Sequence, residues 1–451
     1  MRPATRGAGY FALAVLLAAL AAAMGVALSK HPLSSSLVFA FGLGLLGILA
    51  LTLTRYALAV TLGVLLLAVV WVEPAPPDLV FAVVIAVALA GGTFRTTRVP
   101  VEVLALLAGF LALNMFASIE VVDVARAMLF FSITLYLGIF AVWLAAYVDS
   151  TDRARLIVNA YIFAAVVSAA AATLALFLSF PGQELLVRGP RAKALFKDPN
   201  VFGAFLVPAA LILLEEVTTP RLLRLRPITK TIALSIVTLG ILFSFSRAAW
   251  LNIGVGALVM FLVLALRRGG GKRAMILLAV VLTAAAAVFV SVTLTSSVSF
   301  LQERVGFQPY DVQRFGGQLS GIELAVQYPL GIGPGQFEQV LPISAHSTYV
   351  RALAEEGLLG LLLLLGLALV TLFFAARNVG AGRDTYGIGS AALLGAWCGL
   401  LANSVFIDTL HWRHFWLVAA LIWAGAARSA IRPGRSAWAR PESPPQPTRA
   451  A

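Results

Sequence analysis

The sequence has a single cysteine, Cys398, and few charged residues. A disulfide within one chain needs two cysteines and a thiolate metal site needs several, so both are excluded. Only 12% of the residues are charged, whereas 61% are hydrophobic and the mean hydropathy is +0.95. A soluble globular domain carries about twice that charged fraction, so the composition excludes that class.

Long apolar runs take the place of the missing charges. Runs of about 18 residues or more can cross a ~30 Å hydrocarbon core as helices. They lack the period-two alternation of barrel strands, so we predict an all-α polytopic membrane bundle of 12–14 transmembrane helices. The fourteen candidate spans are 10–28, 33–53, 56–72, 79–92, 101–118, 126–147, 156–180, 200–217, 230–245, 249–266, 274–294, 347–376, 386–407 and 412–427.

The 33 basic and 20 acidic residues are distributed unevenly between the loops. With a cytoplasmic N-terminus, 22 of the 33 basic residues fall in cytoplasmic loops or in the C-terminal tail. The positive-inside rule therefore predicts a multi-pass membrane protein in this orientation. The net charge of +13 is then explained by topology and by contact with anionic membrane lipids, and we expect no nucleic-acid partner.

Three regions are expected along the chain. Residues 1–186 form N-terminal transmembrane helices, and residues 187–427 form the candidate catalytic membrane region. That region includes one long external loop, 295–346. The basic, proline-rich stretch 428–451 is expected to be a disordered cytoplasmic tail.

Eleven basic residues lie on or near the external side in this topology, and most of them cluster. VRGPRAKALFKDPN (187–200) contains Arg188, Arg191, Lys193 and Lys197, FSFSRAAW contains Arg247, and the long loop contains Arg304 and Arg314 before His346. Each feature alone also fits a solvated loop, an interfacial anchor, a helix start or a turn.

Taken together, these external cations indicate an anionic ligand, because the sequence offers no matching acidic cluster. Arginine suits phosphate, since its planar fork binds two oxygens and stays charged. A neutral histidine beside it can accept a proton from a hydroxyl, because its unperturbed pKa is near ~6.5.

Several motifs resemble the O-antigen ligase and Wzy-type polymerase superfamily of bacterial envelopes, over roughly residues 187–410. FKDPN (196–200) and SFSRAAW (244–250) each open a helix, and YPLGIGPGQF (328–337) precedes AHSTYVRALAEEGLLG (345–360) and a long apolar helix. Ser347 stands where the family commonly has asparagine after the histidine. The glycine-rich turn is expected to let the backbone approach substrate, and Arg351 is expected to pair with Glu355, one helical turn later.

The resemblance implies a multi-pass GT-C-like glycosyltransferase of the bacterial inner membrane that works at the periplasmic face without metal or other cofactor. The donor would be an undecaprenyl-diphosphate-linked glycan, and the acceptor a glycan or the lipid A core. Arg247, Arg304 and Arg314 would bind the diphosphate, and His346 would act as general base. The substrate-binding residues would be Arg188, Arg191, Lys193, Lys197 and Asn200.

Two alternatives stay open at this point. A Wzy-type O-antigen or exopolysaccharide polymerase would use the same chemistry and differ only in the acceptor, although the family name favours a ligase. A flippase or other transporter of lipid-linked oligosaccharides would carry its charges near the bilayer midplane, on broken helices. Here the unusual charges are predicted to be external, which favours a transferase.

Overall fold

The protein is an all-α bundle, as predicted. The computed structural model describes residues 35–119, 121–266, 271, 275 and 309–430. Its helices are α2 (Ser35–Thr54), α3 (Tyr56–Leu66), α4 (Pro76–Ala90), η1 (Thr96–Arg98), α5 (Val101–Ala117), α6 (Val124–Tyr147), α7 (Thr151–Leu174), η2 (Gln183–Leu185), α8 (Pro199–Thr218), α9 (Pro227–Phe243), α10 (Arg247–Leu266), α13 (Pro309–Gln327), α14 (Phe337–Val340), α15 (Thr348–Gly380), α16 (Ser390–Asn403) and α17 (Arg413–Ala430). Strands β1 (Val187–Arg188) and β2 (Arg191–Ala192) pair as a small antiparallel hairpin.

The apolar runs of the sequence correspond to these helices. Twelve of the fourteen predicted spans coincide with a helix, whereas 10–28 and, apart from residue 275, 274–294 lie outside the described residues. Within the described part, five helices are long and apolar enough to cross a membrane, and six further apolar helices are shorter. The five long helices are α6, α7, α8, α10 and α15. The chain is therefore a multi-pass membrane protein.

Helix starts follow from local sequence signals. The carboxylates of Asp123 and Asp198 cap α6 and α8 by accepting backbone N–H groups at 2.9 and 2.7 Å, and the hydroxyl of Ser347 caps α15. Pro199 and Pro227 lie in the first turns of α8 and α9. Backbone N–H groups in a first turn have no acceptor within the helix, so proline, which lacks the N–H, breaks no hydrogen bond there. These caps fix where the external loops enter the bundle.

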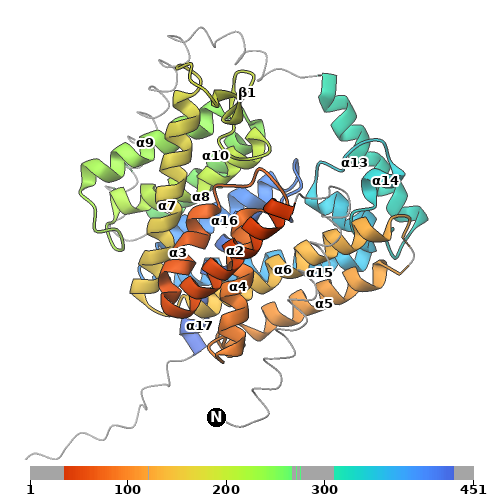
Figure 1. Ribbon diagram of the computed structural model, residues 1–451, viewed down its shortest axis with the longest axis horizontal. Helices are drawn as coiled ribbons and strands as arrows, with labels where there is room; N and C mark the ends of the chain where they lie inside the picture. Colours follow the sequence, from red (N-terminus) through yellow and green to blue (C-terminus); the bar gives the residue numbers. More distant parts are fainter. Residues whose placement is uncertain (1–34, 120, 267–270, 272–274, 276–308, 431–451) are drawn as a thin grey trace, which may run out of the picture.

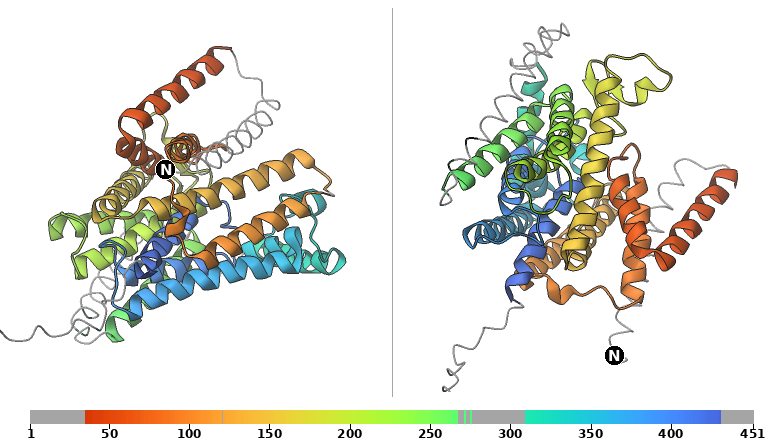
Figure 2. Two further views of the ribbon diagram at one scale, coloured as in Figure 1. Left: turned by 90° about the horizontal axis from the view of Figure 1, so that it is seen from below. Right: turned by 90° about the vertical axis from the view of Figure 1, so that its left-hand side faces the viewer.

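The first and last parts of the chain share one hydrophobic core. Helices α5, α6 and α15 lie side by side across the bundle (Figure 1; Figure 2, left), and α17 packs against α6. A buried ion pair joins α4 to α17, with Arg413 Nε 2.7 Å from an Asp78 carboxylate oxygen. The proposed catalytic region 187–427 is therefore built on the N-terminal helices rather than beside them.

Loops that the topology places on the external side contact one another. The backbone of Val70 pairs with the segment 195–197, Asp123 N donates to Gln336 Oε1 at 2.9 Å, and Thr348 N donates to Ser404 O at 2.9 Å. Five connections between helices thus take part in these contacts, at the end of the bundle where the candidate site lies.

The described part of the long external loop contains two helices. Helices α13 and α14 lie at one edge of the molecule beside the start of α15 (Figure 1). One face of α13 is apolar and exposed, a pattern typical of helices at a membrane surface. Its exposed residues are Val312, Phe315, Leu319, Ile322 and Val326.

Candidate functional site

A pocket of about 380 Å³ brings together four of the predicted arginines. Four arginines and one aspartate line it, so the formal charge of its wall is strongly positive. We call it the basic pocket. Its lining residues are Arg188, Pro190, Arg191, Asp198, Asn200, Phe245, Arg247, Ala248, Arg314 and Ile407.

The hairpin β1–β2 positions two of these arginines. Arg188 and Arg191 are register partners across its Gly-Pro turn, where Gly189 has a φ of +58°. Arg191 donates from Nε to Ser244 O at 2.9 Å and from Nη2 to Asn200 Oδ1 at 3.0 Å. One guanidinium group therefore ties the hairpin to the start of α8 and the end of α9.

Helix α13 closes the pocket from the other side. Arg247, the first residue of α10, forms a two-point ion pair with Asp311 of α13, with one N–O distance of 3.0 Å. Asp198 similarly lies 3.2 Å from Arg188. The sequence offers no acidic cluster to match these cations, but a single carboxylate binds each of Arg188 and Arg247.

Three predicted cations are not placed in this pocket. Lys193 Nζ donates to Leu185 O at 2.7 Å and to Phe196 O at 3.4 Å, and Lys197 forms an ion pair of 2.6 Å with Glu73. Neither lysine lines the basic pocket. Arg304 lies outside the described residues.

His346 directly precedes Ser347, the N-cap of α15, and is not among the residues that line the basic pocket. Its φ is +46°, a left-handed conformation that costs a non-glycine residue about 1–3 kcal/mol. Gln318 of α13 holds this conformation by donating to His346 O at 3.2 Å. Such local strain is typical of functional positions, because the surrounding structure must maintain it.

The environment of His346 keeps its imidazole neutral near pH 7. Burial, together with the positive charges of Arg314 and Arg351, holds the pKa of His346 below its ordinary value of 6.5, whereas Glu338 and Asp198 oppose the shift. Both Arg314 and Asp198 line the basic pocket, so His346 is electrostatically coupled to it. A neutral imidazole beside bound phosphate can accept a proton.

Arg351 connects the elements behind His346. Its guanidinium group forms ion pairs with Glu355 at 2.7 Å, Asp408 at 2.8 Å and Glu338 of α14. The expected pairing with Glu355 is confirmed. Arg351 and Glu355 are 6% and 2% exposed, so the pair is buried, and it joins α14, α15 and the loop after α16.

Helix α6 is attached to the same network. Arg126 donates to Gly335 O at 2.6 Å and lies 3.1 Å from Glu338. The guanidinium groups of Arg126 and Arg351 lie 5.2 and 5.8 Å from the centre of the Phe130 ring, within the range of cation–π attraction. The segment that carries His346 is thus anchored on N-terminal helices.

The glycine-rich turn packs against protein rather than facing the pocket. Gly331, Gly333 and Gly335 have φ values of +87°, +94° and +71°, and a side chain at Gly331 would overlap the carbonyl oxygen of Glu355. The turn also donates from Ile332 N and Gly333 N to carbonyl groups of α15. A side chain at Gly333 would meet Ala117 and Val121, and one at Gly335 would meet Phe130, so the turn packs against α15, the end of α5 and α6. The expectation that it lets the backbone approach substrate stays a prediction.

Those carbonyl groups lie where α15 is interrupted. Gly357 has a φ of +72°, which breaks the helical bonding pattern just after Glu355 and Glu356. The turn takes over two of the bonds, with Ile332 N 3.0 Å from Ala354 O and Gly333 N 2.8 Å from Glu355 O. Irregular backbone within a membrane bundle is tolerated when protein satisfies it in this way.

Substitution at this contact is expected to destabilise the fold. Gly331→Ala forces a positive φ on alanine and places a methyl group against the Glu355 carbonyl, whereas Gly316→Ala on α13 meets nothing within 4 Å. We expect Gly331→Ala to lower the thermal unfolding midpoint in detergent and Gly316→Ala, at an exposed helical position, to raise it slightly. Equal midpoints for the two variants would contradict the packing described here.

Comparison with known proteins addresses the middle of the chain. Residues 232–365 match the family described as O-antigen ligase. The chain carries an O-antigen ligase region. This region contains Arg247, Arg314, His346 and Arg351, whereas the hairpin arginines precede it. The resemblance to the O-antigen ligase and Wzy-type superfamily seen in the sequence is confirmed over residues 232–365. No curated protein matches the chain.

Sequence reasoning missed the carboxylates and the aromatic ring around this O-antigen ligase region. Asp311, Glu338 and Asp408 each bind an arginine that the sequence had placed on the external side. The available signal was that each is an isolated carboxylate in a predicted external segment. No feature of the sequence distinguished Phe130, because it lies within an ordinary apolar span.

Proposed function

We propose that the chain is a membrane glycosyltransferase that moves a glycan from undecaprenyl diphosphate to an acceptor hydroxyl at the periplasmic face. The observation that carries this proposal is the convergence of four arginines in one pocket that is coupled to His346. The acceptor is expected to be a lipid A core sugar, as for an O-antigen ligase, and residues 187–427 would form the catalytic region.

In the proposed step, the glycan moves from the diphosphate to the acceptor oxygen, and one proton is released from the acceptor. The acceptor oxygen attacks C1 of the donor sugar while the C1–O bond to diphosphate breaks, and the diphosphate leaves with the electron pair. His346 takes the proton of the acceptor hydroxyl. Arg188, Arg191, Arg247 and Arg314 would stabilise the negative charge that develops on the leaving diphosphate, because donors held in place before the reaction need little reorganisation.

Arg188 and Lys197 belong to one basic cluster in the sequence but have different surroundings in the structure. This difference gives a binding test. Arg188 lines the basic pocket, whereas Lys197 binds Glu73 outside it, and both side chains are exposed, at 67% and 49%. A charge-assisted hydrogen bond contributes about 1.5–3 kcal/mol, so Arg188→Gln should weaken binding of undecaprenyl diphosphate about tenfold or more. Lys197→Gln should leave the dissociation constant unchanged.

Both variants are compared with wild type in detergent, with undecaprenol as the ligand that lacks phosphate. Undecaprenol should bind all three proteins equally. The proposal for the pocket fails if Arg188→Gln binds the diphosphate as wild type does, or if Lys197→Gln weakens binding as much as Arg188→Gln.

A further inference from the structure

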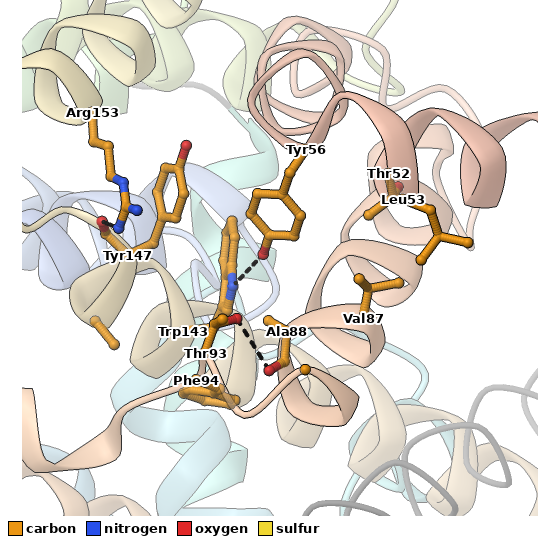
Figure 3. Close-up of a pocket in the computed structure, with 12 residues that line it drawn as sticks. Thr52, Leu53, Tyr56, Val87, Ala88, Thr93, Phe94, Trp143, Tyr147 and Arg153 are labelled. Carbon is orange, nitrogen blue, oxygen red and sulfur yellow. Dashed lines mark hydrogen bonds between the residues drawn. The ribbon is translucent and has the colours of Figure 1, made fainter.

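A second cavity, of about 330 Å³, lies outside the O-antigen ligase region. Residues from α2, α3, α4, the connection to η1, and the ends of α6 and α7 line it (Figure 3). The predicted topology places these segments at the cytoplasmic end of the bundle, opposite to the basic pocket. Four aromatic side chains dominate its wall. They are Tyr56, Phe94, Trp143 and Tyr147.

The aromatic wall is held in a fixed arrangement. Trp143 Nε1 donates to the hydroxyl of Tyr56 at 3.1 Å (Figure 3). That hydroxyl in turn donates to Val84 O at 3.3 Å. The rings of Trp143 and Tyr147 are stacked, with centroids 5.3 Å apart. A preformed apolar slot of this kind binds a chain-like ligand at low entropic cost. Its volume is at the lower end of the range of about 300–1,000 Å³ for small-molecule pockets.

One arginine lines the slot, and two more are neighbours of lining residues in the chain. The Arg153 guanidinium group lies 4.8 Å from the centre of the Tyr147 ring, and 45% of its side chain is exposed. Arg55 directly precedes Tyr56, Arg95 directly follows Phe94, and both are exposed. Arg153 shares the Asp149 carboxylate, 3.1 Å away, with Arg98, so one carboxylate faces two guanidinium groups there.

We propose that this slot binds an anionic phospholipid of the cytoplasmic leaflet. One acyl chain would enter between the aromatic rings, and the phosphate would lie against Arg153, with Arg55 and Arg95 nearby. Aromatic side chains and arginines together mark the membrane interface, where one end of a ligand is apolar and the other is charged. The anionic lipids of that leaflet supply this chemistry.

The test measures bound lipid rather than glycan transfer, so it is independent of the proposed function. Full-length protein purified in detergent is incubated with equal amounts of phosphatidylglycerol and phosphatidylcholine, and retained lipid is identified by native mass spectrometry. Wild type should retain phosphatidylglycerol about tenfold better. The double variant Arg55→Gln/Arg153→Gln should lose this preference.

Three comparisons make the outcome decisive. Arg224→Gln, which removes an exposed arginine from another loop of the same predicted side, should keep the preference. Val87→Phe, which fills the slot but leaves the arginines, should reduce retention of both lipids. Soluble glycerol phosphate should not compete.

The proposal is overturned if wild type retains the two lipids equally, or if the double arginine variant behaves as wild type does. It is also overturned if glycerol phosphate displaces phosphatidylglycerol, since the ligand would then be a soluble phosphate compound.

Discussion

Arg351→Met is expected to destabilise the protein by about 3–5 kcal/mol, because removal of one partner leaves buried charge uncompensated. Arg351 lies 2.7 Å from Glu355 and 2.8 Å from Asp408 and also binds Glu338. Unfolding in detergent can be followed with a thiol-reactive dye, since the single cysteine, Cys398, is only partly exposed. The unfolding midpoint of the variant should fall well below that of wild type.

A second substitution distinguishes the loss of charge compensation for Glu355 from the loss of packing by the Arg351 side chain. Arg351→Met/Glu355→Gln also removes the charge of the most deeply buried partner, which is 2% exposed. The effects of substitutions at contacting residues of one network on stability are not additive, so the double variant should recover part of the lost stability. A midpoint for Arg351→Met equal to that of wild type would show that the network does not stabilise the external loops.

His346→Ala is expected to lower the rate of transfer by about 10²–10⁴-fold, the usual contribution of a positioned general base. The pH dependence of wild type should identify the group. Protonated His346 cannot accept a proton, so the rate should fall as the pH drops through its pKa. Because burial and the charges of Arg314 and Arg351 hold that pKa below 6.5, the rate should stay flat around neutral pH.

Arg314→Gln should shift this profile in a defined direction. Removing a neighbouring positive charge raises the pKa of His346, so the acidic limb should move to higher pH. Lys197→Gln, which does not line the basic pocket, should leave the limb in place. An unchanged limb in Arg314→Gln, even with a lower maximal rate, would contradict the coupling between the pocket and His346.

The transmembrane helices were predictable because lipid leaves the backbone few alternatives. The span expected at 200–217 is Pro199–Thr218, and that at 126–147 is Val124–Tyr147. Helix α13 was missed as a helix within the long external loop. Its mixed polar and apolar sequence, with Gly316, Gly317 and Gly321, lacks the continuous apolar run by which the spans were recognised.

The candidate site was predictable in its cations but not in its geometry. Arg188 and Arg191 face each other across a hairpin and both reach the pocket, whereas Lys193, two residues later, turns back to Leu185 O. Amino-acid composition cannot distinguish a basic residue that lines the pocket from one that donates to a nearby backbone carbonyl. Nor could it pair Arg247 with Asp311, since the contact spans 64 positions of sequence.

The most direct test of the proposed function is a transfer reaction with purified protein, an undecaprenyl-diphosphate oligosaccharide and a lipid A core acceptor, in detergent with EDTA present. Glycan length and the molecule that carries the product are measured for wild type and His346→Ala. The account predicts glycan on the acceptor and free undecaprenyl diphosphate with wild type only. A ladder of longer lipid-linked glycans would instead identify a polymerase. Binding of the donor without chemical change by wild type would contradict transfer altogether and favour transport.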